Sequence, residues 1–401
     1  MASDNLGQET TATEIARIFS DRIRGKTILV TGVSPNSLGA ETVRSIASQN
    51  PKLLIMASRT KEKLESVSIK IKEEFPDAEI QSVLLDLSSQ KSVRRAADEI
   101  NVLVDHLDIL INNAGMASDS QERSLSSEGI EMHLATNHIG HFLLTNLLFE
   151  KLQAAAGRDA SGSVRVINLS SNAYRYSPVR FADYNFNGKQ IPPEEEPLPP
   201  AFNFVPRSPG STYHSMVAYG QSKSANILFS VYLMEHLGKQ GILSFCVHPG
   251  TIESGFLRGL TQESIENLKK MKGVFWKTPD QGAATTLMAA LDPKLYKSSA
   301  IFMRDCQSSE SAPYAEDKKL ADKLWKLSEE LAVENSFLVG RHGRRGATTG
   351  VRRLLSKIGL VTFPVGCHKY QVWFHSRALV IGHTSISVLL LEFTKESLRT
   401  L

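Results

Sequence analysis

The sequence predicts an α/β fold in which short buried strands alternate with helices. Short apolar runs recur along the chain, and longer segments with helical periodicity separate them. The first run, Thr27–Val30, leads through a glycine-containing turn directly into a helix, as in parallel α/β sheets. At 401 residues, 41% of them hydrophobic, the chain can form one large domain or two smaller ones.

That first turn has the composition of a dinucleotide-binding loop. In such a loop, glycines let backbone N–H groups and a helix N-terminus approach a pyrophosphate. Gly32 and Gly39 fit the first and last glycines of the motif, but one extra residue is inserted and Asn36 or Ser37 stands at the middle position. From these residues alone, an ordinary strand-to-helix loop is an equally good interpretation.

The end of the second strand, Leu53–Ala57, indicates which cofactor is bound. An acidic residue there would bind a ribose 2′-hydroxyl, whereas an arginine accommodates a 2′-phosphate. Arg59 follows the strand, so we expect NADP(H) rather than NAD(H). A solvated arginine at the start of the helix over 61–75 is the alternative.

Polar residues also follow the third and fourth strands. Asp86 comes after the strand Ile80–Leu85, where it could contact an adenine or cap the helix that begins near Ser89. Capping is the better explanation from the residue alone. The run Asn112–Gly115 follows the strand Leu107–Ile111, and its small residues would let the backbone approach a ligand.

A predicted helix over 129–152 carries polar residues on a largely apolar background. The amide of Asn137 would satisfy local backbone groups or also hold a water molecule. We interpret His138 and His141 as packing or rim residues rather than metal ligands, because no acidic residue or cysteine lies at coordinating spacing.

The fifth strand, Val164–Leu169, ends at Ser170 and Ser171. A serine hydroxyl at this position can hydrogen-bond a substrate oxygen, and no nucleophile elbow surrounds it, which argues against a hydrolase. The insert that follows, 175–212, is rich in proline and aromatic residues. Long loops of this kind are functional or disordered, and we expect this one to wall a substrate pocket.

A helix beginning near Ser215 carries Tyr219 and Lys223, one turn apart on one face. A phenol with a pKa of about 10 is a weak acid–base catalyst at neutral pH, and an adjacent ammonium favours its ionised form. Tyr314 and Lys318 have the same spacing within an acidic segment, which we interpret as a solvated surface pair.

The C-terminal half continues the alternation. A sixth strand, 242–247, leads into a proline- and glycine-containing turn over 248–254 that would bend over a ligand at the strand ends. Residues 255–276 are predicted to form a mobile helical flap. The remaining predicted elements are a short amphipathic helix over 14–24, helices over 278–291 and 315–333, and a last strand over 300–303.

Composition excludes several classes of function. Residues 340–401 hold ten of the 46 basic residues but two of the 42 acidic ones, so the remainder is mildly acidic and we expect no nucleic-acid partner. Three widely spaced cysteines, Cys246, Cys306 and Cys367, argue against a disulfide framework or a metal site and fit a reducing compartment. The chain shows no signal sequence and no apolar segment of membrane-spanning length, so we expect a cytoplasmic protein.

The basic tail, 340–401, differs from the rest of the chain. It has no acidic residue before Glu392, and its apolar segment, 378–391, is too short to span a bilayer. A poorly ordered or non-native extension is our first interpretation. A basic membrane-surface anchor and a nucleic-acid or partner arm are the alternatives.

Taken in order, these motifs resemble the short-chain dehydrogenase/reductase family over about residues 14–335. The run Asn137–Phe142, the insert and the segment around Tyr219 resemble the branch of retinol dehydrogenases and WW-domain oxidoreductases, without a WW domain. They are also similar to fungal reductases of secondary metabolism. The matching segments are Thr31–Gly39, Asp86, Asn112–Gly115, Asn137, Ser170–Ser171, Tyr219 with Lys223, and Pro249–Gly250.

The resemblance implies a role for each residue of the site. Tyr219 would be the general acid/base, and Lys223 would lower its pKa and bind the nicotinamide ribose. Ser171 would polarise a carbonyl, and Asn137 would complete a proton relay through water. Contacts to NADP(H) would come from Gly32, Ser37, Leu38, Gly39, Arg59, Asp86, Asn113, Ala114, Tyr219, Lys223, Ile252 and Ser254.

The resemblance also implies a Rossmann-type fold, with a doubly wound, mostly parallel seven-stranded sheet in one domain over 14–339. A disordered N-terminus, 1–13, would precede it. We expect an oxidoreductase that interconverts a carbonyl and an alcohol on a small hydrophobic substrate, and a homo-oligomer is compatible with the sequence. The alternative is a cofactor-binding scaffold or regulatory protein with little catalysis.

Overall fold

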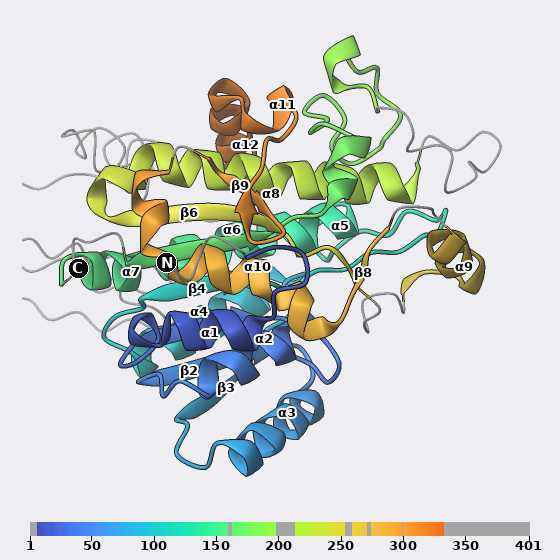
Figure 1. The fold of residues 1–401 in the computed structure, drawn as a ribbon. Helices are drawn as coiled ribbons and strands as arrows, with labels where there is room; N and C mark the ends of the chain where they lie inside the picture. The colour runs from blue at the N-terminus through green and yellow to red at the C-terminus, as the bar shows by residue number, and fades with distance from the viewer. Residues whose placement is uncertain are drawn as a thin grey trace, which may run out of the picture. The chain divides into compact units, whose positions relative to one another are not determined.

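The apolar runs of the sequence form one open sheet, which positions the predicted site (Figure 1). The computed structural model describes residues 6–158, 163–197, 213–252, 259–270, 274–298 and 300–332. In this part of the chain the sheet has eight strands in the order β10-β9-β6-β5-β4-β1-β2-β3. They are β1 (Thr27–Thr31), β2 (Leu53–Ser58), β3 (Ile80–Leu84), β4 (Ile109–Asn112), β5 (Val164–Leu169), β6 (Ile242–His248), β9 (Phe302–Arg304) and β10 (Gln307–Ser308).

The strand order explains why the residues of the predicted site gather at one edge of the sheet. All neighbouring strands from β3 to β9 pair in parallel, so their carboxyl ends share one edge of the sheet. The order reverses between β1 and β4, and a crevice at such a switch point is the usual ligand site of doubly wound sheets. The predicted Rossmann-type architecture is therefore confirmed.

The eighth strand was not predicted. β10 pairs antiparallel with β9 across a two-residue turn in which Asp305 and Cys306 have φ angles of 51° and 60°. Two left-handed residues are typical of a tight hairpin, but this turn is Asp305-Cys306 and not the Asn-Gly or Asp-Gly pair that usually indicates one. A separate two-stranded pair, β7 (Thr251–Ile252) and β8 (Trp276–Lys277), lies next to the turn after β6.

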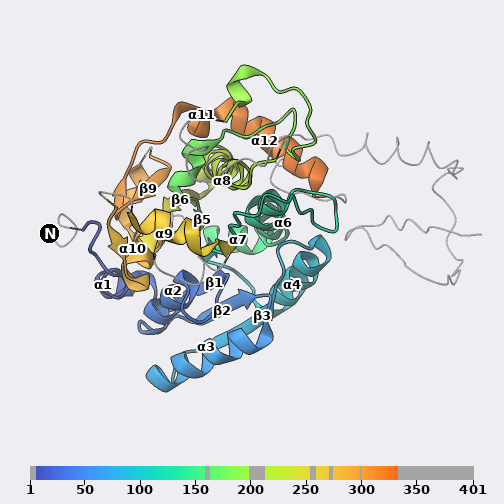
Figure 2. The ribbon, with the colours of Figure 1, turned by 90° about the vertical axis from the view of Figure 1, so that its right-hand side faces the viewer.

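Helices cover both faces of the sheet (Figure 2). On one face the core contains side chains of α1 (Ala12–Ile18), α2 (Leu38–Ala47), α3 (Lys61–Glu74) and α10 (Pro279–Leu291). The other face is covered by α4 (Gln90–Leu103), α5 (Met132–Leu134), α6 (Gly140–Leu147), α7 (Phe149–Ala156), α8 (Ser215–Leu237) and α12 (Lys318–Leu331). Short helices α9 (Gln262–Lys270) and α11 (Pro313–Glu316) complete the described elements.

Helix α8 is the most buried helix of the site. It contacts β5 and β6 on one side and α11 and α12 on another, and most of its residues are buried. A helix enclosed in this way carries apolar and small residues around its whole circumference rather than on one stripe. Lys223 is therefore held in a solvent-excluded environment, whereas Glu235 and His236 near the C-terminal end of the helix are exposed.

Three expectations about local structure are corrected. Residues 6–13 are not disordered, because Leu6 and Thr10 are buried and Thr13 hydrogen-bonds Asp280 through both its N–H (3.0 Å) and its hydroxyl (3.0 Å). The helix expected over 129–152 contains a π-helical segment, Ala135–Ile139. The helix expected over 315–333 is divided into α11 and α12, which meet at Asp317.

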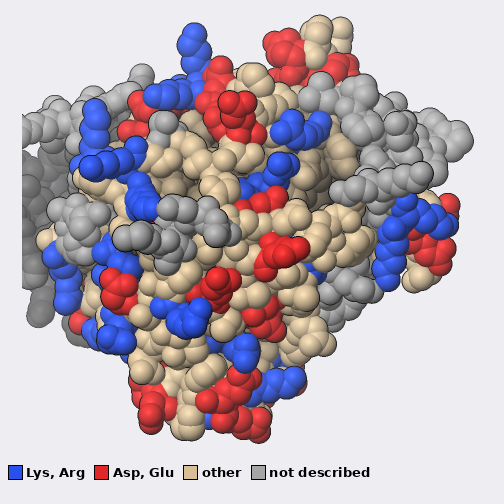
Figure 3. Space-filling model, viewed as in Figure 1, with Lys and Arg blue, Asp and Glu red and all other residues tan. Residues whose placement is uncertain are grey.

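The charge distribution agrees with a mildly acidic body. On the face shown in Figure 3, basic and acidic side chains are interspersed, and neither sign forms a continuous stripe. No helix among the described residues is long and apolar enough to cross a membrane. Among the same residues, no three His, Cys, Asp or Glu side chains are grouped as metal ligands would be.

Some predicted segments lie outside the described residues. They are the tail 340–401, the insert residues 198–212, and residues 253–258, which include Ser254 and the start of the flap.

Candidate active site

Helix α8 places Tyr219 and Lys223 beside each other, as the spacing predicted. Both are buried, with 6% and 3% of their surface exposed. The Lys223 Nζ lies 5.6 Å from the centre of the Tyr219 ring and donates a hydrogen bond to the Leu169 carbonyl at 3.0 Å. The Ser170 hydroxyl donates to the Lys223 carbonyl at 2.8 Å, so the end of β5 is fastened to this turn of α8.

Ser171 reaches Tyr219 from the end of β5. It caps a 3₁₀ helix, Asn172–Tyr176, by accepting the Ala173 N–H at 3.2 Å. The same hydroxyl forms a hydrogen bond with the Tyr219 phenol. The structure thus brings Ser171, Tyr219 and Lys223 together at the carboxyl edge of the sheet.

Asn137 joins this group through the π-helical segment. Its amide brackets the backbone of Met116, accepting from the Met116 N–H at 2.8 Å and donating to the Met116 carbonyl at 3.0 Å. It also donates to the Ser222 hydroxyl on α8 at 2.9 Å. π-helical turns concentrate at functional sites. Here the turn directs one amide at both the loop after β4 and helix α8.

Burial sets the proton affinities of the pair. It raises the pKa of Tyr219, and the hydrogen bond from Ser171 opposes that shift. It lowers the pKa of Lys223 to about 8. The sequence led us to expect that Lys223 lowers the pKa of Tyr219. The net shift is upward instead, because removing the phenolate from water outweighs the stabilising contacts.

The turn between β1 and α2 packs too closely to admit side chains at its two glycines. Gly32 has a φ of +76°, and a Cβ built there would lie 2.5 Å from the Ala114 Cα. A Cβ at Gly39 would lie 2.7 Å from the Gly32 carbonyl oxygen. The turn accommodates its extra residue, relative to the dinucleotide-binding motif, at Asn36, which adopts a left-handed φ of 58°. Side chains at these two positions would collide with neighbouring backbone, so the two glycines let the turn pack closely against the loop after β4 and the start of α2.

Ser37 and Leu38 begin helix α2. Ser37 is its N-cap and accepts the Ala40 N–H at 3.2 Å while donating to the Ser34 carbonyl at 2.7 Å. The side chains of Leu38 and Ile252 both pack against Gly282. A Cβ built at Gly282 would lie 2.7 Å from a Leu38 methyl group and 2.5 Å from an Ile252 methyl group. The structure therefore brings together two predicted cofactor residues that are far apart in the sequence.

Asn113 and Ala114 are tied to the end of β1. The Asn113 amide donates to the Thr31 carbonyl at 2.6 Å, and the Ala114 N–H donates to the Thr31 hydroxyl at 3.0 Å. The Thr31 hydroxyl lies 2.9 Å from the His141 Nε2, whose Nδ1 lies 3.1 Å from the Asn137 carbonyl. The sequence placed Thr31 in the family motif without a role of its own and assigned His141 to packing or to the rim of the site.

Arg59 and Asp86 lie at the ends of β2 and β3. Arg59 is exposed and takes part in no hydrogen bond or ion pair with another described residue. Asp86 accepts from the N–H and hydroxyl of Ser88 at 3.0 and 2.7 Å. The N-cap of α4 is Ser89, so the capping explanation for Asp86 is wrong.

Comparison with known proteins identifies the family. The model for the short chain dehydrogenase family matches residues 26–185. Retinol dehydrogenase 12 of Mus musculus is 33% identical over 310 residues, which are 77% of this chain and 87% of that protein. The chain belongs to the short-chain dehydrogenase/reductase family. Oxidoreductase fscI of Fusarium equiseti is 38% identical over 242 residues, which are 60% of this chain and 93% of that protein.

A solved structure has a similar fold. An uncharacterised protein of Mycobacterium paratuberculosis matches 77% of this chain and 94% of its own chain, with 28% identity and a TM-score of 0.55. The predicted likeness to retinol dehydrogenases and to fungal reductases is confirmed. Members of the short-chain dehydrogenase/reductase family are oxidoreductases that use NAD(H) or NADP(H).

Proposed function

We propose that the chain is an NADP(H)-dependent oxidoreductase that interconverts a carbonyl and an alcohol, with Tyr219 as general acid/base. The observation that carries this proposal is the buried group of Ser171, Tyr219 and Lys223. A phenol hydrogen-bonded to a serine and adjacent to a lysine has few structural uses but suits proton transfer to oxygen. A cofactor-binding scaffold would not require this combination.

The residues divide the chemistry between them. In the reductive direction, a bound nicotinamide would supply the hydride that a carbonyl carbon needs. Ser171 hydrogen-bonds the carbonyl oxygen, and Tyr219 donates the proton that this oxygen needs. The Lys223 ammonium, with a pKa of about 8, carries its charge at neutral pH and stabilises the phenolate that remains. Asn137 holds the Met116 backbone and α8 in register while this occurs.

A hydrophobic substrate fits the surroundings of Tyr219. Its ring forms an apolar cluster with Ala117 and Ala173, against which three larger side chains pack. Those side chains, Tyr176, Met216 and Leu260, come from three different segments. The insert contributes Phe186, which packs with Tyr213 at the start of α8. We infer that this wall favours apolar carbonyl compounds, and a panel of them assayed by NADPH absorbance tests the activity.

Substitution of Arg59 tests the preference for NADPH over NADH. Because only NADPH presents a 2′-phosphate, Arg59→Ala should weaken NADPH binding and leave NADH binding unchanged. A charge-assisted hydrogen bond contributes about 1.5–3 kcal/mol, or roughly ten- to hundredfold in Kd. Titration of both cofactors by fluorescence measures this. The matched control is Arg44→Ala, since Arg44 is also exposed but pairs with Glu74 at 2.7 Å. Equal losses of affinity for both cofactors would show that Arg59 does not bind the 2′-phosphate and is an ordinary surface residue.

A further inference from the structure

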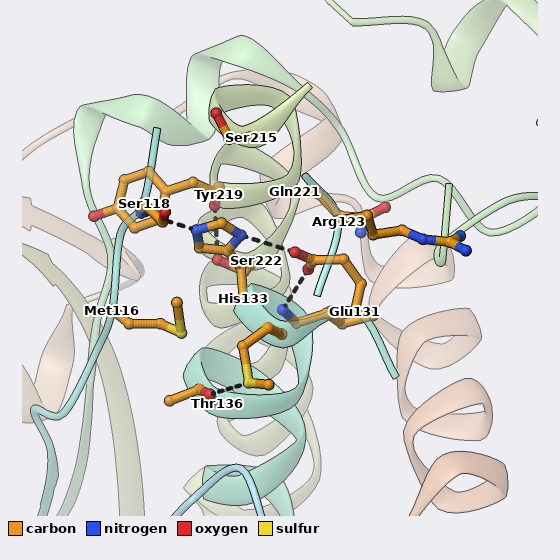
Figure 4. A network of polar contacts seen from close by, with 12 residues as sticks. Met116, Ser118, Arg123, Glu131, His133, Thr136, Ser215, Tyr219, Gln221 and Ser222 are labelled. Carbon is orange, nitrogen blue, oxygen red and sulfur yellow. Dashed lines mark hydrogen bonds and ion pairs between the residues drawn. The ribbon is translucent and has the colours of Figure 1, made fainter. Parts of the chain in front are cut away.

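A buried glutamate–histidine pair lies beside Tyr219 but takes no part in the chemistry described above (Figure 4). Glu131 is 0% exposed and His133 is 2% exposed. The His133 ring lies edge-on to the Tyr219 ring, with centroids 5.9 Å apart and an interplanar angle of 64°. Both residues come from the start of α5, directly before the π-helical segment that carries Asn137.

The hydrogen bonds of the pair define its proton arrangement. The His133 Nε2 accepts the Ser118 N–H at 3.1 Å, so this nitrogen has no proton. The proton is therefore on Nδ1, which donates to a Glu131 carboxylate oxygen at 2.8 Å. The carboxylate also accepts the Leu134 N–H at 2.9 Å and the Tyr213 hydroxyl at 3.1 Å. Three donors satisfy a carboxylate that has no access to water.

The pair connects two segments that surround Tyr219. Ser118 belongs to the loop after β4, and its neighbour Ala117 packs on the Tyr219 ring. Tyr213 lies directly between the insert and α8, and Asn185 of the insert accepts the Glu131 N–H at 2.8 Å. Loop, insert and the ring of Tyr219 thus converge on one Glu–His pair, as Figure 4 shows for Ser118, Glu131, His133 and Tyr219.

We propose that Glu131 and His133 are positioning residues that hold the Tyr219 phenol and the loop at Ser118 in the reactive arrangement. The proposal rests on the proposed function of Tyr219. Stability alone would not require a hydrogen-bonded pair here, because replacing both partners by apolar groups of the same shape can be nearly neutral. Orientation does require it, because a displacement of about 1 Å at a reacting group can lower turnover by roughly 10²-fold.

The experiment compares two substitutions of His133. His133→Phe keeps a ring against Tyr219 but removes both hydrogen bonds. His133→Gln keeps an acceptor for the Ser118 N–H and a donor for Glu131. We expect His133→Phe to lower kcat by about 10- to 100-fold without changing the Kd for NADPH, and His133→Gln to recover most of the loss. The control is His236→Phe. His236 stacks on Tyr232 and lies roughly 25 Å from Tyr219 along α8, so its substitution should not affect kcat.

A milder variant covers the case in which His133→Phe does not fold. Tyr213→Phe removes one of the three donors to Glu131 and should lower kcat severalfold, again without a change in NADPH binding. If the folded variants turn over like the wild type and only their thermal midpoints fall, the pair is purely structural and the inference is wrong. The proposed function fails separately, if Tyr219→Phe retains turnover.

Discussion

Two tyrosine–lysine pairs with identical spacing have different surroundings in this molecule. Tyr219 and Lys223 lie on one continuous helix, α8, and both are buried at the carboxyl edge of the sheet. Tyr314 lies on α11, whereas Lys318 begins α12. Asp317 ends the first of these helices and caps the second by accepting the Leu320 N–H at 2.9 Å. The helical face that the spacing assumes therefore does not exist for the second pair.

The second pair is not simply solvated either, which corrects our expectation. Tyr314 is half-buried, and its hydroxyl donates to the Tyr174 carbonyl at 2.8 Å. Only Lys318 is on the surface, where its ammonium lies 2.6 Å from a Glu235 carboxylate oxygen. Spacing thus predicts proximity only where a helix continues and another element covers it. For Tyr219 and Lys223, β5 supplies that cover.

The largest expected difference between the pairs is catalytic. Tyr219→Phe removes the proton donor and should lower kcat by about 10²–10⁴-fold, while NADPH binding is retained. Tyr314→Phe removes a hydroxyl that donates to the Tyr174 carbonyl, so turnover should stay near the wild-type value. Steady-state kinetics of the two purified variants decide this. Equal losses would contradict our assignment of Tyr219.

The second difference concerns pH. The pKa of Lys223 is lowered to about 8 from its usual 10.5, so the reductase should lose activity as the pH rises above 8 and the ammonium beside Tyr219 is neutralised. The free energy of unfolding should instead increase as the pH rises. Between pH 8 and 10.5 the unfolded chain binds more protons at this site than the folded chain, so the contribution to stability increases with pH.

A pH profile of kcat/KM, together with urea unfolding at each pH, tests both signs. Lys318→Met provides the control, because Lys318 is exposed and should not affect either profile. A reductase whose kcat/KM is constant from pH 7 to about 10 would show that the charge on Lys223 is not needed.

Much of the site followed from the sequence because its residues stand at strand ends. Gly32, Asn113 and Ser171 each follow a strand of a parallel sheet, and parallel strands end at one edge. The sequence could not assign Thr31, Glu131 or His133. Their roles depend on partners from distant segments, such as the Ser118 N–H, and no periodicity encodes those contacts. The π-helical turn at Asn137 and the left-handed Asn36 are likewise set by tertiary packing.

The smallest difference between the pairs is one of stability. Tyr314→Phe deletes a hydrogen bond to a carbonyl that also accepts from the Ser224 hydroxyl at 3.0 Å, so no acceptor is left unsatisfied. The loss should be about 0.5–1.5 kcal/mol. Lys318→Ala removes a surface ion pair whose net contribution is about 0–1 kcal/mol, because solvent screens it and two long side chains must be ordered. Urea unfolding should therefore show a lower midpoint for Tyr314→Phe than for Lys318→Ala, with unchanged m-values. The reverse order would mean that Lys318, and not Tyr314, fastens the junction of α11 and α12 to α8.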